Sequence, residues 1–191
     1  HCPTAKCVIK ADDDNILHVS AYERMCREYE ANATFFGSCL SNKPVERYTT
    51  KWIVPSYVFP NSTYPTYCSA GAYALAGAQT NVGKLLEALK RTPFYASNNY
   101  RMVSEDVIFT GFLAVIAGIK RTLVQGISFD PAPSLFCHNF TLTTLSAHVP
   151  GAWTVERYWS SMREKIGVPC PASSTPSKPT TLNKLKPLRY P

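Results

Sequence analysis

Three consecutive carboxylates, Asp12, Asp13 and Asp14, are the residues of this chain whose type and spacing most directly suggest chemistry. They follow the apolar segment 7–9, which is typical of a buried strand, and α/β proteins hold ligands at the ends of such strands. Adjacent acids repel one another, and a divalent cation or a cationic substrate between them relieves that repulsion. An ordinary acidic turn is the simpler alternative, since Asp is a common turn former.

A second acid pair, Glu105 and Asp106, and a late histidine, His148, are the other candidates. Together with the acidic run they would suit a divalent-metal site that acts on a phosphorylated substrate. Each also has a structural explanation. The acid pair would complement the dipole of a helix that Ser104 caps, and His148 would fit an alternating strand as a structural histidine. No P-loop, G-x-S-x-G or H-E-x-x-H motif is present.

The periodicity of apolar residues predicts an α/β fold that would position these side chains. A capping box at Ser20–Glu23 predicts the start of the first helix. Further helices are predicted over 81–91, 107–118 and 154–166, and strands over 7–9, 34–40, 51–54, 67–75, 121–129 and 141–149. Residues 57–67, rich in Pro and Tyr, are predicted to form a surface loop, and 98–103 a polar loop. We expect a folded part over residues 1–168 and a disordered tail over 169–191, which is rich in Pro, Ser, Thr and Lys.

The composition points to an oxidising compartment. The 191 residues include seven cysteines without a C-x-x-C zinc pattern, so disulfides are the simpler explanation. Three acceptor triplets for N-glycosylation, beginning at Asn32, Asn61 and Asn139, agree with it. The formal net charge is +7, but the basic residues are scattered, so we expect no nucleic-acid partner.

No targeting or membrane segment is visible in the sequence. The longest apolar stretch, 107–119, is too short to cross a bilayer, and no signal peptide precedes the first strand. A protein of the secretory pathway needs such a signal. We therefore expect the chain to be the C-terminal part of a longer protein, attached to a membrane only through an N-terminal anchor outside this sequence.

Six short motifs in a fixed order resemble the beta-1,3-galactosyltransferase family, glycosyltransferase family 31. They are Cys2-Pro3, Val8 to Asp14, Lys51-Trp52, Tyr64 to Ser69, Glu105-Asp106-Val107, and His148 followed by Tyr158-Trp159. The resemblance covers about residues 2–171. It implies a GT-A-like mixed sheet with flanking helices that lacks the N-terminal nucleotide-binding strands, so that residues 1–168 form the C-terminal part of a catalytic domain.

The resemblance also implies roles for individual residues. Asp14 corresponds to the last acid of the family's D-x-D motif and would bind manganese, Mn²⁺, with Asp12 and Asp13 nearer the ribose or supporting the ligand. His148 would be the second metal ligand. Asp106 corresponds to the catalytic base.

The activity implied by the family is an inverting transfer of galactose or N-acetylhexosamine. The donor would be a UDP-sugar, the acceptor a glycan or glycoprotein hydroxyl, and the location the lumenal side of the Golgi membrane. Trp52, Tyr67 and Glu105 are candidate sugar contacts, as are Tyr64 and Tyr73. For each aromatic residue taken singly, packing in the core is the alternative.

The chain departs from the family pattern in two places. Ala70 and Ala72 replace glycines on either side of Gly71, and their methyl groups would narrow a sugar pocket or need a small backbone shift. The segment Glu105–Gly111 carries one more residue before its glycine than many members do. These departures leave open a non-catalytic relative that acts as a binding module in the secretory pathway. A small secreted disulfide-rich module would leave the ordered motifs unexplained.

Overall fold

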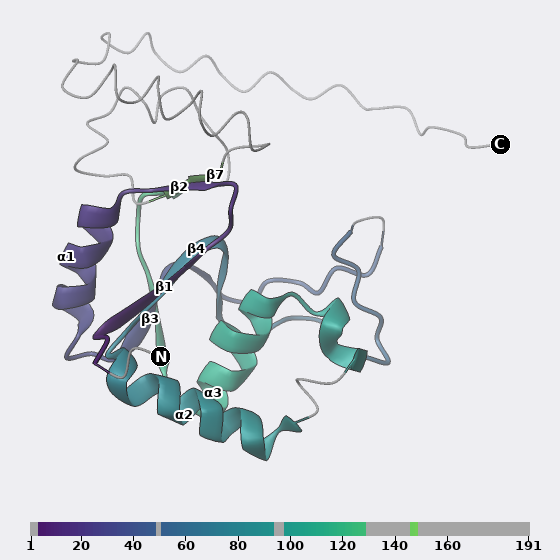
Figure 1. Ribbon diagram of the computed structural model, residues 1–191. Helices are drawn as coiled ribbons and strands as arrows, with labels where there is room; N and C mark the ends of the chain where they lie inside the picture. The colour runs from purple at the N-terminus through teal and green to yellow at the C-terminus, as the bar shows by residue number, and fades with distance from the viewer. Residues whose placement is uncertain (1–3, 49–50, 94–97, 129–145, 149–191) are drawn as a thin grey trace, which may run out of the picture.

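The main sheet of the computed structural model has four strands and mixed direction. The structure describes residues 4–48, 51–93, 98–128 and 146–148. The strand order is β1 (Cys7–Ala11), β4 (Tyr67–Ala76), β3 (Thr34–Leu40) and β5 (Lys120–Leu123). Strand β4 runs antiparallel to β1 and β3, whereas β3 and β5 are parallel. The predicted mixed sheet is therefore confirmed (Figure 1).

Helices cover both faces of this sheet (Figure 1). Because side chains alternate along a strand, Phe36 packs towards helix α1 (Val19–Tyr29), while its neighbour Phe35 packs on the other face. That other face is covered by the π-helix η3 (Val107–Leu113) and by α3 (Ala114–Ile116). The helices predicted after the acidic run and after Asp106 are both present.

A further helix and a second, smaller sheet complete the regular structure. Helix α2 (Ala78–Arg91) follows β4 and contacts β1 and β4. The small sheet has the order β2 (Asn15–Leu17), β7 (Ser146–His148) and β6 (Ile127–Ser128). Strand β2 is antiparallel to β7, and β6 is parallel to β7.

The segment predicted as a strand over 51–54 is instead part of a long loop between β3 and β4, so that prediction was wrong. Arg47 organises this loop by donating to the carbonyl oxygens of Val54, Phe59 and Asn61 at 2.5, 2.7 and 2.6 Å. Val54 is buried in an apolar cluster. Burial of that one side chain, rather than pairing with a neighbouring strand, accounts for the short apolar run.

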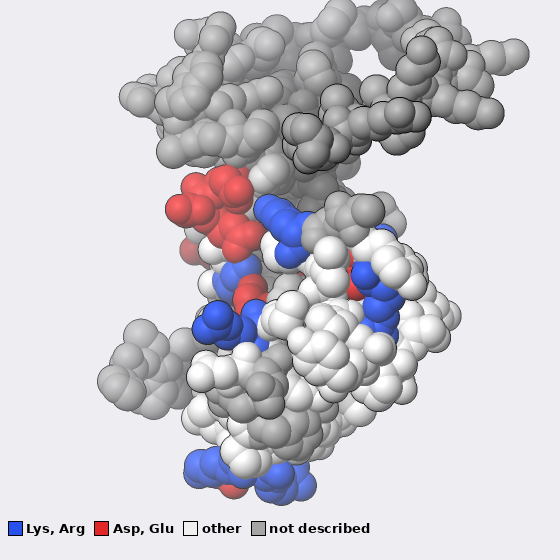
Figure 2. Space-filling model, turned by 90° about the vertical axis from the view of Figure 1, so that its right-hand side faces the viewer, with Lys and Arg blue, Asp and Glu red and all other residues white. Residues whose placement is uncertain are grey.

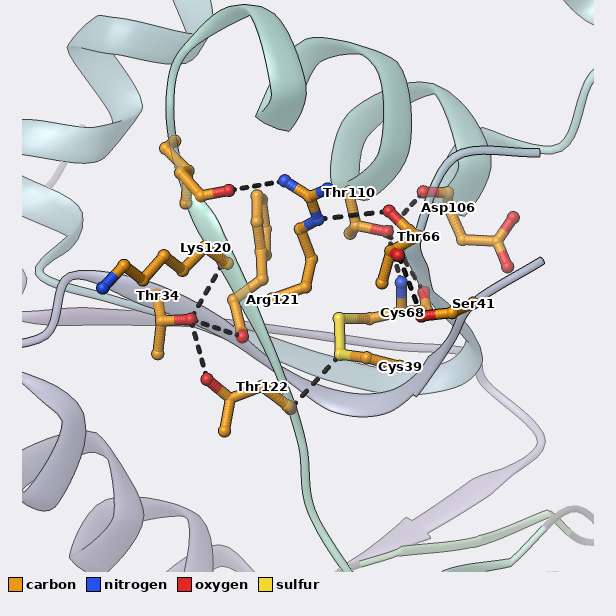
Figure 3. Close-up of a disulfide and its surroundings, with 12 residues drawn as sticks. Thr34, Cys39, Ser41, Thr66, Cys68, Asp106, Thr110, Lys120, Arg121 and Thr122 are labelled. Atoms are coloured by element: carbon orange, nitrogen blue, oxygen red, sulfur yellow. Dashed lines mark hydrogen bonds between the residues drawn. A yellow bond between two sulfur atoms is a disulfide. The ribbon is translucent and has the colours of Figure 1, made fainter. Parts of the chain in front are cut away.

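Two disulfides confirm the expectation from the cysteine count. Cys7–Cys26 links β1 to α1, and Cys39–Cys68 joins the paired strands β3 and β4. Figure 3 shows the second disulfide beside β5, where the Thr34 hydroxyl donates to the Lys120 carbonyl oxygen at 2.9 Å. One disulfide therefore fastens helix α1 to the main sheet, and the other links two neighbouring strands within that sheet.

Three other local predictions were wrong. The first helix begins after His18, whose Nδ1 accepts from the Ala21 amide, and not with the capping box expected at Ser20. The strand expected over 121–129 is divided into β5 and β6, with Gly126 between them at a φ of +92°. The loop expected at 98–103 contains the 3₁₀ helix η2 (Asn98–Met102).

Some expectations lie outside the described residues, namely the helix over 154–166, the tail over 169–191 and most of the strand over 141–149. Within the described ranges, no helix combines the length and the apolar character needed to cross a membrane.

The face shown in Figure 2 carries a compact acidic patch, with basic side chains beside it and in a separate group at its opposite end. Charge of both signs is thus distributed over this face.

Candidate active site

The acidic run forms the tight turn between β1 and β2. The Asn15 amide donates to the Asp12 carbonyl oxygen at 3.2 Å across the turn, and the Asp12 amide donates to the Gly71 carbonyl oxygen of β4 at 2.9 Å. Asp13 is exposed, whereas Asp12 and Asp14 are half-buried. The turn and the strand-end site were alternatives in the sequence, and the structure shows that the run is a turn at a strand end.

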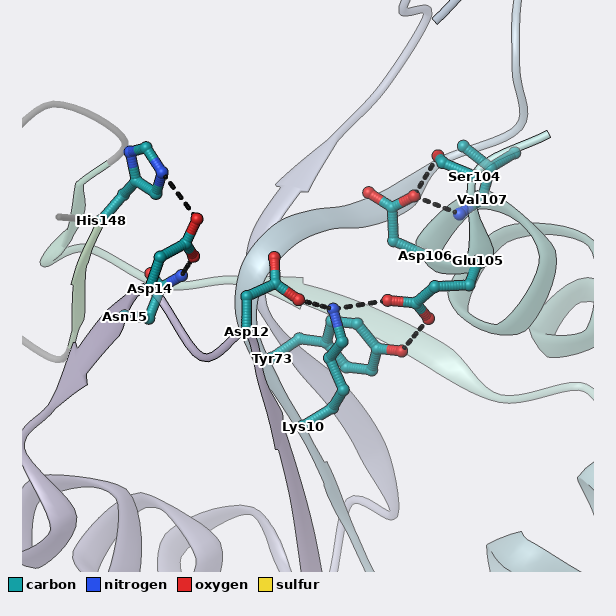
Figure 4. A network of polar contacts seen from close by, with 10 residues as sticks. All are labelled: Lys10, Asp12, Asp14, Asn15, Tyr73, Ser104, Glu105, Asp106, Val107 and His148. Carbon is teal, nitrogen blue, oxygen red and sulfur yellow. Dashed lines mark hydrogen bonds and ion pairs between the residues drawn. The ribbon is translucent and has the colours of Figure 1, made fainter. Parts of the chain in front are cut away.

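Asp14 lies beside His148, although the two are far apart in the chain. The pairing of β2 with β7 places Asn15 opposite His148, so the preceding residue reaches the histidine ring. Asp14 Oδ2 is 3.1 Å from His148 Nε2, and Asn15 Nδ2 donates to Asp14 Oδ1 at 2.9 Å (Figure 4). The structure therefore brings together the two residues that the sequence singled out as metal ligands.

Asp106 is buried at the start of the helical segment that covers the main sheet. Its side chain is only 3% exposed. Oδ1 accepts hydrogen bonds from the Ser104 hydroxyl and, at 2.9 Å, from the Val107 amide. Ser104 was expected to cap the helix, and here its hydroxyl donates to the carboxylate. Asp106 is thus held in one orientation by its own neighbours.

A pocket of about 340 Å³ opens beside Asp106. Its walls combine aromatic and aliphatic side chains with a few polar groups, namely Lys43, Pro44, Glu46, Trp52, Val54, Tyr64, Tyr67, Ser69, Met102, Ser104 and Asp106. Trp52 is 56% exposed at this pocket, whereas Tyr67 is buried. Flat apolar faces around a carboxylate and hydroxyl groups can accommodate a sugar ring.

The environment raises the pKa of three tyrosines near the acids. Burial, followed by the charge of Asp106, raises the pKa of Tyr67 to about 12. Burial and the charge of Glu105 raise the pKa of Tyr73, and burial raises that of Tyr64 against the opposing charge of Arg47. All three hydroxyls therefore keep their protons at neutral pH and can donate hydrogen bonds.

Glu105 lies outside this pocket lining and belongs to a charge cluster with Lys10 (Figure 4). Lys10 Nζ is 2.5 Å from Asp12 Oδ1 and 2.5 Å from Glu105 Oε1. The Tyr73 hydroxyl donates to Glu105 Oε2 at 2.8 Å. The sequence interpretation assigned no role to Lys10, although its position two residues before a strand-end acidic run was a usable signal.

A divalent cation fits the donor atoms of Asp14 and His148. Carboxylate oxygen and imidazole nitrogen are both metal ligands, and carboxylates suit Mn²⁺ in particular. Among the described residues, no three His, Cys, Asp or Glu side chains form a cluster that could hold a metal ion. Within the part of the chain that the structure describes, Asp14 and His148 are therefore the pair that could hold such a cation.

Ala72 and the longer Glu105–Gly111 segment, which the resemblance implies are departures from the family pattern, have a structural account. The methyl group of Ala72 is fully buried in the core cluster beneath α1 and does not line the pocket beside Asp106. The extra residue between Glu105 and Gly111 lies in a segment that is π-helical from Val107 to Leu113. A π-helix bonds i to i+5 and so takes one more residue into each turn than an α-helix. Gly111 still packs closely against Tyr67, where an added Cβ would meet the Tyr67 Cβ at 3.3 Å.

Comparison with known proteins places the chain in a family. A family model described as galactosyltransferase matches residues 1–125. This match spans the acidic turn, the pocket and the helical segment after Asp106, and the chain belongs to the galactosyltransferase family.

Curated relatives of the chain are beta-1,3-glycosyltransferases. The human acetylgalactosaminyl-O-glycosyl-glycoprotein beta-1,3-N-acetylglucosaminyltransferase is 30% identical over 96 residues, which cover 49% of this chain and 24% of that protein. The rat UDP-GlcNAc:betaGal beta-1,3-N-acetylglucosaminyltransferase 7 is 23% identical over 66% of this chain and 30% of its own length. Mouse beta-1,3-galactosyltransferase 1 is 22% identical over 88% of this chain and 49% of its own length. The chain thus spans between about a quarter and half of the relatives it matches.

Proposed function

We propose that the protein carrying this chain is a metal-dependent inverting glycosyltransferase. It would transfer galactose or N-acetylhexosamine from a UDP-sugar to a hydroxyl of a glycan or glycoprotein. The single observation that carries the proposal is the arrangement of Asp14 against His148 on one side and a buried Asp106 in a pocket on the other. Family membership and the names of the relatives support it.

The proposed role of Asp106 is that of a general base. Two hydrogen bonds to Oδ1 orient the carboxylate, and the pocket beside it is wide enough for a sugar ring. Asp106 would remove the proton of the acceptor hydroxyl as that oxygen attacks the anomeric carbon of the donor. A single displacement inverts the configuration at that carbon and needs no nucleophile from the protein.

The proposed role of Asp14 and His148 is to hold the donor diphosphate through Mn²⁺. When bound, the cation would neutralise the negative charge that develops on the departing nucleoside diphosphate. Asp12 and Asp13, in the same turn, would lie nearer the ribose or support the ligand residue. Trp52 and Tyr67 would offer apolar faces and a hydroxyl to the acceptor sugar.

The proposed location is the lumenal side of the Golgi membrane. Two disulfides among the described residues suit an oxidising compartment, and the family resemblance implies the secretory pathway. Attachment to the membrane through an N-terminal anchor is part of the same proposal.

Calorimetric titration of UDP into the complete protein tests the nucleotide site directly. With Mn²⁺ present we expect a binding heat that disappears when the metal is chelated and is lost in Asp14→Ala. Glu87→Ala, which removes an exposed partner of Lys90 on α2, should bind like the wild type. Binding by Asp14→Ala with unchanged metal dependence would contradict the proposal.

The same titration separates the proposal from a non-catalytic relative. A binding module that has lost the donor site would show no metal-dependent heat in the wild type. If heat is observed, transfer assays with UDP-galactose, UDP-N-acetylglucosamine and UDP-N-acetylgalactosamine would identify the donor sugar.

A further inference from the structure

Lys10 connects the two parts of the candidate site. It leaves the end of β1 and places its ammonium group between Asp12 of the acidic turn and Glu105, the neighbour of Asp106. The Lys10 side chain is 30% exposed, and those of Asp12 and Glu105 are 39% and 45% exposed. Figure 4 shows Lys10 midway between the turn and the start of the helical segment.

The positive charge of Lys10 balances the negative charges of Asp12 and Glu105, whose repulsion would otherwise push the acidic turn and the helix start apart. Without a cation between them, Asp12 and Glu105 would repel each other across the gap that the ammonium group bridges. Tyr73 adds a second constraint, because its hydroxyl donates to the other oxygen of Glu105 and its ring lies 5.6 Å from Lys10 Nζ. Glu105 is therefore held at both carboxylate oxygens, one by a strand-end lysine and one by a strand tyrosine.

We propose that Lys10 is a positioning residue that holds the helix start carrying Asp106 against the acidic turn. This inference rests on the proposed function. The turn carries Asp14, so the Lys10 bridge sets the separation between the site of the donor diphosphate and the base that activates the acceptor. A misplacement of about 1 Å between reacting groups can cost about 10²-fold in rate.

Three variants of the complete protein isolate this role. Lys10→Met keeps an unbranched side chain and removes the charge, so Asp12 and Glu105 are left to repel each other. Lys10→Arg keeps the charge and can contact both acids. Lys90→Met is the matched control, because it breaks an exposed lysine–glutamate pair with Glu87 on α2.

Hydrogen–deuterium exchange measures the positioning without any activity assay. In Lys10→Met we expect faster amide exchange over residues 12–15 and 104–108, because both segments lose their common contact. Lys10→Arg and Lys90→Met should exchange like the wild type in these segments. Unchanged exchange in Lys10→Met would overturn the proposal, whether or not the wild type transfers sugar.

Kinetics then tests whether the lost positioning matters for transfer. We expect Lys10→Met to lower kcat at least about tenfold with a smaller change in the donor KM, and Lys10→Arg to restore most of the loss. In a Glu105→Gln background the same substitution should have little further effect, since residues that act through one contact are not additive. Full additivity, or a wild-type kcat in Lys10→Met, would contradict the role of Lys10. Absence of any sugar transfer by the wild-type protein would instead contradict the proposed function.

Discussion

Gly71 occupies the position of β4 that supports the acidic turn. Its carbonyl oxygen accepts from the Asp12 amide, and its φ of +100° is a backbone conformation that other residues rarely adopt. An added Cβ would meet Asn15 Oδ1 at 3.1 Å, and Asn15 in turn donates to Asp14. A glycine is therefore needed at this position, between two alanines that replace glycines of the family pattern.

We predict that Gly71→Ala destabilises the protein by about 1–3 kcal/mol, because it adds backbone strain and displaces Asn15. Urea denaturation of the complete protein measures the change in the free energy of unfolding. Gly83→Ala on α2 is the control. Nothing lies within 4 Å of an added Cβ at Gly83, so that substitution should stabilise by about 0.5–1 kcal/mol. Equal effects of the two substitutions would contradict the role of Gly71.

Tyr67 makes the stability of the fold depend on pH in the alkaline range. Its pKa is raised from 10.0 to about 12, chiefly by burial and then by the charge of Asp106. The unfolded chain therefore loses this proton at a lower pH than the folded protein does. The stabilisation that the protonated Tyr67 hydroxyl contributes is complete below pH 10 and is lost as the pH rises towards 12.

We predict that Tyr67→Phe flattens the fall in the free energy of unfolding between pH 10 and 12 relative to the wild type. Denaturation curves recorded at several pH values measure this slope. Tyr57→Phe is the matched control, because the Tyr57 side chain is 85% exposed. A slope that is the same in the wild type and in Tyr67→Phe would exclude Tyr67 as its source.

Lys10 shows what the sequence left undetermined at the scale of single residues. The acids at 12–14 were recognisable because like charges at a strand end are unusual. The partners of Lys10 are a neighbouring acid and Glu105, and the second contact depends on how the helix after Ser104 packs on the sheet. That packing is a tertiary property, which local spacing does not determine.

At the scale of elements, the π-helix η3 accounts for the extra residue that the resemblance implies in the Glu105–Gly111 segment. Asp106 stays in the pocket at one end, and Gly111 stays against Tyr67 near the other. Phe109 lies between them and is 42% exposed. An extra residue here is tolerated because it widens one turn and leaves the register of the following helix unchanged.

We predict that deletion of Phe109 converts this segment to an α-helix and costs only about 1–2 kcal/mol. Deletion of Val115 in α3, which is 52% exposed, should cost at least about 3 kcal/mol. Residues 116–128, the described segment that follows, contain no π-helical turn to absorb the change, so the buried Ile119 would leave its site. Denaturation of both variants gives the comparison. Similar losses in the two would contradict this account of the π-helix.

The sequence predicted the strand over 34–40 with the observed bounds and the helix over 81–91 from apolar residues at helical spacing, although that helix begins earlier, at Ala78. The errors lie where local preference and tertiary contacts disagree. His18 caps α1 although histidine is not a favoured capping residue. Arg47 holds the loop that contains residues 51–54 by donating to three carbonyl oxygens, and residues 51–54 form no strand. Gly126, with its positive φ, separates β5 from β6 in a run that was predicted as one strand.

At the scale of the whole molecule, the candidate site is assembled from segments that are distant in the sequence. Pairing of β2 with β7 brings His148 to Asp14, and packing of η3 on β4 brings Asp106 to the pocket lined by Tyr67. The family resemblance predicted that Asp14 and His148 lie together, and the structure places them in contact. It could not predict the pocket walls contributed by Lys43, Glu46 and Met102, because these depend on the conformation of the loop between β3 and β4 and on the 3₁₀ helix η2.

The most direct test of the account is the rate of sugar transfer by Asp106→Asn in the complete protein. This substitution keeps the size of the side chain and removes the proposed base. We predict a loss of about 10²- to 10⁴-fold in kcat, while the metal-dependent binding of UDP stays as in the wild type. Transfer by Asp106→Asn at the wild-type rate would contradict the assignment of the base and, with it, the proposed mechanism.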